Sequence, residues 1–129
     1  MTDTAPDLDV IARMGEEALN QIPAELRRHC EGLVIRVADF ADDEVLQDLG
    51  IEDPFELMGL YQGVALPYRS VMDPGGENDC VWLYRRPILD YWTESGESLR
   101  HIVRHVMIHE IGHHFGFSDD DMDTIESLD

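Results

Sequence analysis

The chain is poor in basic residues, and this shortage excludes two kinds of partner. Lys and Arg together number 9 against 28 Asp and Glu, so the formal net charge is −19. A surface of that sign repels nucleic-acid phosphates and anionic lipids, so neither is expected to bind. It attracts basic peptides or proteins, although the charge also has the plainer explanation that it keeps the protein in solution.

Cysteines and long apolar runs are scarce as well. Cys30 and Cys80 lie far apart and form no Cys-x-x-Cys pattern. This argues against a disulfide framework or a cysteine zinc site and predicts two buried, reduced thiols. The N-terminus lacks the features of a secretory signal, and no apolar run approaches the roughly 20 residues that span a bilayer. We therefore expect a cytoplasmic protein.

The 129 residues correspond to one domain over residues 8–129, preceded by a flexible tail at 1–7. Apolar spacing and turn residues predict helices at 8–19, 24–30, 39–50, 88–92, 97–115 and 119–128. Strands are expected at 32–38, 56–66 and 80–85, the last one ended by Pro87. This order indicates an α+β fold with a small three-stranded mixed sheet packed on helices.

Three local signals support these assignments. Asp7 is placed to cap the first helix, and Gly50 to end the helix at 39–50. Gly59 and Gly63, inside the second predicted strand, suggest a bulge or a close approach of another segment.

The chemistry of the chain is concentrated on the longest predicted helix. His109 and His113 are four residues apart, so both imidazoles lie on one face and can reach a single metal ion. Glu110 is offset round the helix and is placed to reach a water on the metal. A catalytic zinc needs a third ligand. Gly116 suits a sharp turn after the helix, and that turn can bring Asp119 beside the imidazoles.

The stretch 109–119 matches the pattern H-E-x-x-H-x-x-G-x-x-D, and with it the chain resembles the small bacterial zincin-like metallopeptidases, whose fold is a minimal zincin. Two weaker segments add to the likeness: the GLYxG-like residues 59–63 and an LYRRPI-like strand at 83–88. The resemblance implies one zinc ion held by His109, His113 and Asp119, with Glu110 as catalytic base.

Several further residues are candidates for the surroundings of the metal. His114 is turned about 100° from its neighbour His113, which favours a packed or supporting position over a ligand. Met122 is either a core residue or lies under the metal, as in the Met-turn of metzincins. Tyr61, Tyr84 and Arg85 are alternative donors to the oxyanion, and the sequence does not choose among them.

The expected activity is hydrolysis of a peptide or protein substrate, with 81–84 as the sheet edge along which a peptide would align. A second interpretation is a non-catalytic zinc-binding module that holds a peptide or a basic partner protein. A third is a non-haem iron enzyme, because two histidines and a carboxylate also describe that site. The sequential His-Glu-x-x-His pattern favours zinc, and the sequence leaves the oligomeric state open.

Overall fold

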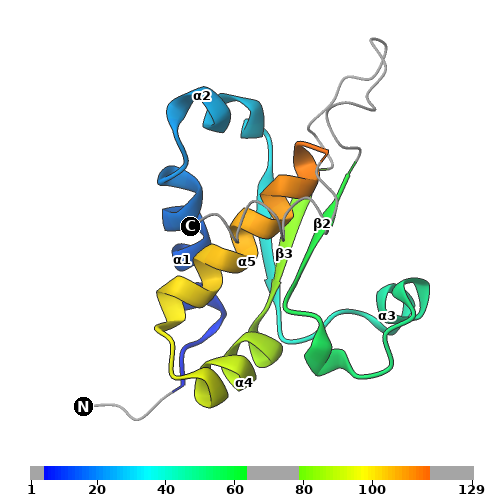
Figure 1. Cartoon of the computed structure of the whole chain (residues 1–129). Coiled ribbons are helices and arrows are strands. Elements are labelled where there is room, and N and C mark those ends of the chain that lie inside the picture. Colours follow the sequence, from blue (N-terminus) through cyan, green and yellow to red (C-terminus); the bar gives the residue numbers. More distant parts are fainter. Residues whose placement is uncertain (1–4, 64–78, 117–129) are drawn as a thin grey trace.

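A computed structural model describes residues 5–63 and 79–116, and it has the α+β fold that the sequence predicts (Figure 1). The helices are α1 (Leu8–Asn20), α2 (Ala24–Arg27), α3 (Asp43–Leu49), α4 (Arg85–Ser95) and α5 (Leu99–His114), with 3-10 turns η1 (Arg28–Cys30) and η2 (Pro54–Glu56). The strands are β1 (Val34–Ala38), β2 (Gly59–Gln62) and β3 (Cys80–Tyr84). The predicted helix at 119–128 lies outside the described residues.

A side chain caps the N-terminus of each of the two long helices that pack together, α1 and α5. The Asp7 carboxylate accepts the Val10 N–H at 3.0 Å before α1, as predicted. The Ser98 hydroxyl accepts the His101 N–H at 3.1 Å before α5. Gly50 follows α3 with a φ of 71°, the left-handed conformation that suits glycine at a helix end.

The sheet has the order β1-β3-β2, with β1 parallel to β3 and β2 antiparallel to it. β3 is therefore the central strand, and four of its five residues are buried. The prediction that residues 81–84 form an open edge is wrong, because both sides of β3 are already paired. β2 is the strand at the edge nearer α5 (Figure 1).

Helices α1 and α5 pack against each other and cover one face of the sheet, α1 over β1 and α5 over β2 and β3. Val81 and Leu83 of β3 join the main core beneath these helices. The alternate residues Trp82 and Tyr84 pack on the other face, with Leu46 of α3. One face of α5 is buried in the main core: Leu99, Ile102, Val103, Val106 and Met107.

Two predictions about residues 56–88 need correction. The second strand is shorter than expected at its start, because residues 54–56 form a 3-10 turn and β2 begins only at Gly59. The third strand ends at Tyr84, one residue before its predicted end, and Pro87 is not what ends it: α4 begins at Arg85, and Pro87 lies in its first turn. Backbone N–H groups in a first turn have no partner within the helix, so proline is tolerated there.

Two further expectations can be compared with the described residues. Cys30 and Cys80 are buried free thiols, as predicted. No helix within residues 5–63 and 79–116 is long and apolar enough to cross a membrane.

Candidate metal centre

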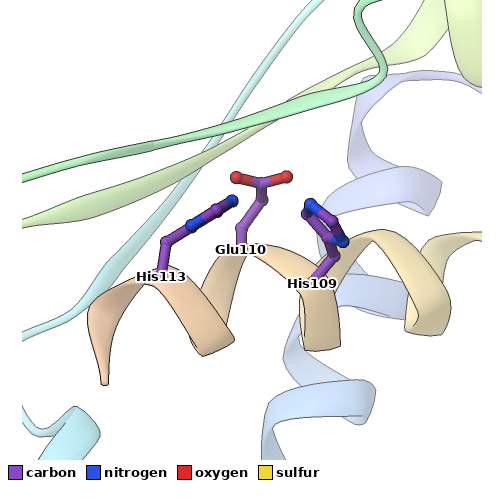
Figure 2. A group of neighbouring side chains, drawn as sticks. All are labelled: His109, Glu110 and His113. Carbon is purple, nitrogen blue, oxygen red and sulfur yellow. The ribbon is translucent and has the colours of Figure 1, made fainter. Parts of the chain in front are cut away.

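The His-Glu-x-x-His residues project from one side of α5 toward the strands (Figure 2). Ligand atoms of His109, Glu110 and His113 all lie within 4.8 Å of one another. The two imidazoles, one turn apart, have ring centroids 5.0 Å apart and planes at 78°. Zinc binds histidine nitrogens at about 2.0 to 2.1 Å, so small rotations bring both nitrogens to one ion. The donor set and spacing fit a metal of this kind.

Glu110 is buried although it carries a carboxyl group. Its side chain is 8% exposed and lies between the two imidazoles in Figure 2. The backbone N–H of Tyr61 in β2 donates a hydrogen bond to Glu110 Oε1 at 3.1 Å. Hydrogen bonding is what makes burial of a carboxylate tolerable. The bond also fixes the carboxylate relative to the sheet as well as to its own helix.

Gly59 allows β2 to approach α5 closely enough for that bond. A Cβ atom at this position would lie 3.2 Å from the Trp82 carbonyl oxygen and 3.4 Å from Glu110 Cγ. It would come closer still to Cγ1 of Val106, one turn before Glu110. The close approach suggested by a glycine in the strand is thus confirmed.

His114 ends α5 and is almost fully buried, at 3% exposure. Its Nδ1 lies 2.9 Å from the Tyr61 hydroxyl, and its Nε2 lies 2.8 Å from the His29 carbonyl oxygen. Asp79 Oδ2 is 3.9 Å from the same Nδ1. The side chain therefore packs between β2 and the segment that precedes β1, one helical turn after Glu110.

Gly63 makes room for this polar group at the end of β2. Its φ of 148° is one that other residues rarely adopt. A Cβ atom there would lie 2.9 Å from the Tyr61 hydroxyl and 2.8 Å from Asp79 Cγ, with Asp79 Oδ1 nearer still. Asp79 itself is 5% exposed and directly precedes β3.

The remaining predicted residues lie in different places. Tyr84 is 2% exposed in the smaller core cluster, and burial, followed by the charge of Asp42, raises its pKa to about 12. Arg85 donates to the Pro6 carbonyl oxygen at 2.6 Å and to Asp39 at 3.1 Å. These contacts attach α4 to the N-terminal segment and to the end of β1. Asp119 and Met122 lie outside the described residues, so their roles stay predictions.

Two groups that surround His114 were not predicted from the sequence. The His29 carbonyl and the Asp79 carboxylate are separated from His114 by 85 and 35 residues, and no motif links them. The sequence held one weak signal for Asp79: it directly precedes the buried strand β3, where neighbouring elements can cover its side chain. His101 and His105, which continue the histidine row toward the start of α5, are exposed.

Two imidazoles and a buried carboxylate on one helix of this α+β fold form a candidate site for a metal ion. The sequence profile of the zincin-like metallopeptidase family matches residues 30–128. The chain therefore belongs to the zincin-like metallopeptidase family, which implies zinc as its metal. A search of curated proteins finds no match.

Proposed function

We propose that this protein is a zinc-dependent peptidase in which His109, His113 and Asp119 hold the metal and Glu110 is the general base. The observation that carries the proposal is the position of Glu110. Its buried carboxylate belongs to the same 4.8 Å group as the two imidazoles and is held by a backbone N–H of the neighbouring strand. A purely structural zinc would not need a carboxylate fixed beside its ligands. The assignment of Asp119 rests on its spacing and on the family.

Bound zinc supplies Lewis acidity, which lowers the pKa of a coordinated water to about 7 and polarises the scissile carbonyl. Glu110 takes a proton from the attacking water and delivers it to the leaving amine. The bond from the Tyr61 N–H to Oε1 orients the carboxylate for this transfer. Because the carboxylate is fixed from two elements, little reorganisation accompanies the transfer.

The edge of β2 is the place where a peptide would align. In an antiparallel ladder, successive residues direct their backbone groups alternately toward and away from the partner strand. Met58 accepts a bond from Tyr84 of β3, whereas the Tyr61 N–H reaches Glu110 on the other side. The outward groups of β2 therefore lie next to the base. An extended substrate added to this edge would cross the metal centre.

Basic peptides are the proposed substrates, because the net charge of −19 attracts them and raises their local concentration. This part of the proposal concerns preference and rate of association. The chemistry at the metal centre does not depend on it.

The test compares the zinc-loaded parent with Glu110→Gln on a diverse peptide library analysed by mass spectrometry. The parent should cleave, a chelator should stop it, and Glu110→Gln should bind zinc while losing about 100-fold or more of the activity. Glu97→Gln is the matched control, because it makes the same carboxylate-to-amide change beyond the other end of α5, where Glu97 pairs with His101. It should leave cleavage unchanged.

Other outcomes would select the other interpretations. Stoichiometric zinc with no cleavage by the parent would favour a non-catalytic module that binds a peptide or a basic partner protein. Metal analysis of protein purified without added metal would show iron if the site were that of a non-haem iron enzyme. Full activity in Glu110→Gln would show that Glu110 is not the base.

A further inference from the structure

Tyr61 is attached to α5 at two points one helical turn apart. Its backbone N–H donates to Glu110 at 3.1 Å, and its hydroxyl lies 2.9 Å from His114 Nδ1. Glu110 and His114 are four residues apart, so they lie on the same face of the helix. One residue of β2 thus contacts the proposed base through its backbone and a second α5 residue through its side chain.

The His29 carbonyl bears on which group donates in the bond between the Tyr61 hydroxyl and His114 Nδ1. The His29 carbonyl oxygen can only accept, so His114 Nε2, at 2.8 Å, carries the hydrogen that it receives. In the tautomer with its hydrogen on Nε2, Nδ1 accepts from the Tyr61 hydroxyl. The buried Asp79 carboxylate lies beside the same nitrogen, at 3.9 Å.

The location of these bonds indicates why they are needed. His114 is the last residue of α5, and Tyr61 is the penultimate residue of the four-residue β2. Ends of helices and strands open more readily than their centres, because fewer neighbours hold them. The hydroxyl–imidazole bond joins two such ends, and Gly63 leaves space beside the Tyr61 hydroxyl and the Asp79 carboxylate.

We propose that the Tyr61 hydroxyl and His114 are positioning residues that hold the Tyr61 N–H, and through it the Glu110 carboxylate, at the metal centre. The inference rests on the proposed function of Glu110 as base. In this arrangement the hydroxyl acts on the protein's own imidazole and not on the oxyanion. Loss of the hydroxyl frees the end of β2, lengthens the bond to Glu110 and misplaces the base. The expected cost is about 10- to 100-fold in kcat, with KM unchanged.

Three variants separate this role from others. Tyr61→Phe keeps the backbone N–H and the ring but removes the hydroxyl. His114→Gln places an amide near the position of Nε2, so it retains a donor for His29 and loses the acceptor for Tyr61. His114→Asn places an amide near Nδ1 and restores that acceptor. Tyr91→Phe is the matched control, because Tyr91 is 43% exposed on α4.

Two readouts are measured on each zinc-loaded variant: kcat and KM, and the amide signal of residue 61 in a proton–nitrogen correlation spectrum. The amide of a Glu110→Gln protein gives the reference position without the carboxylate. In Tyr61→Phe and His114→Gln, the signal should shift toward that reference, and its exchange with solvent should accelerate. His114→Asn should recover much of the loss seen with His114→Gln, and Tyr91→Phe should change neither readout.

The two proposals fail in different ways. If the parent cleaves no peptide, the proposed function fails, and the amide signal still decides whether the hydroxyl holds the N–H on Glu110. An unshifted amide in Tyr61→Phe would overturn the positioning role, whatever happens to kcat. A fall in kcat with an unshifted amide would assign the hydroxyl directly to the substrate. An equal loss in His114→Asn and His114→Gln, with both amides unshifted, would also contradict it.

Discussion

Gly59→Ala is expected to destabilise the protein by forcing β2 away from α5. The added methyl group would press against Cγ1 of Val106, and it would lie 3.2 Å from the Trp82 carbonyl oxygen. Neither neighbour can yield easily. Val106 is 5% exposed, and a β-branched side chain in a helix has essentially one rotamer. The carbonyl belongs to β3, the central strand of the sheet.

The net cost follows from two opposing terms. Overpacking of a closely packed site costs about 1–3 kcal/mol. Replacing glycine restricts the unfolded chain, which returns about 0.4–1 kcal/mol. The expected loss is therefore roughly 1–2 kcal/mol of unfolding free energy. Urea unfolding followed by circular dichroism measures it, with an unchanged slope as the sign that only stability has altered.

Val106→Ala provides the matched second change. Alone it removes two buried carbons and should cost about 2 kcal/mol. In the double variant, the methyl group added by Gly59→Ala would occupy part of the vacated space, so the two losses should fall short of their sum by about 1 kcal/mol. Losses that add to within about 0.5 kcal/mol would refute the steric reasoning, as would a Gly59→Ala protein no less stable than the parent.

Three further predictions concern stability elsewhere. Ser98→Ala removes the hydroxyl that accepts the His101 N–H, and it should lower the unfolding free energy, measured with denaturant, by about 1 kcal/mol. Ser98→Asp keeps an acceptor at this position and should retain most of the stability. Tyr84, with its pKa raised from 10.0 to about 12, keeps its proton in the folded state where the unfolded chain has lost it. The contribution of Tyr84 to the unfolding free energy is therefore complete below pH 10 and is lost between pH 10 and 12. This part of the alkaline fall in stability should be absent from Tyr84→Phe. An identical fall in the parent and in the variant would contradict the assignment. In the Arg100–Glu17 pair both side chains are exposed, at 71% and 50%. Arg100→Gln should therefore change the unfolding free energy by less than about 1 kcal/mol. A larger loss would show that the pair stabilises the fold more than an exposed ion pair does.

Much of the fold was predictable because its signals are local. The cap at Asp7 and the left-handed Gly50 depend on backbone geometry within one turn of each residue. The same holds for the pairing of His109 with His113, which any helix through these residues would produce. The element order then sufficed for the α+β class and for a mixed three-stranded sheet.

The predictions were wrong where one stretch of sequence is compatible with more than one secondary structure or with more than one place in the sheet. Pro87 stops a strand and is equally acceptable in the first turn of a helix, and α4 takes the second option. Residues 81–84 are typical of a strand in composition, but composition does not say which strands lie beside it. The pairing of β3 with both β1 and β2 made it central, so β2 and not β3 is an outer strand of the sheet that residues 5–63 and 79–116 form.

The helix of the candidate metal site could be read from the sequence alone, because ligand spacing along a helix is fixed by its 3.6-residue period. The groups that hold Glu110 and His114 became visible only in the folded structure. The bond from Tyr61 to Glu110 joins residues 49 positions apart, and the bond from His114 to His29 spans 85. Such contacts depend on how α5 packs across the sheet, and that packing is the joint result of every buried side chain between them.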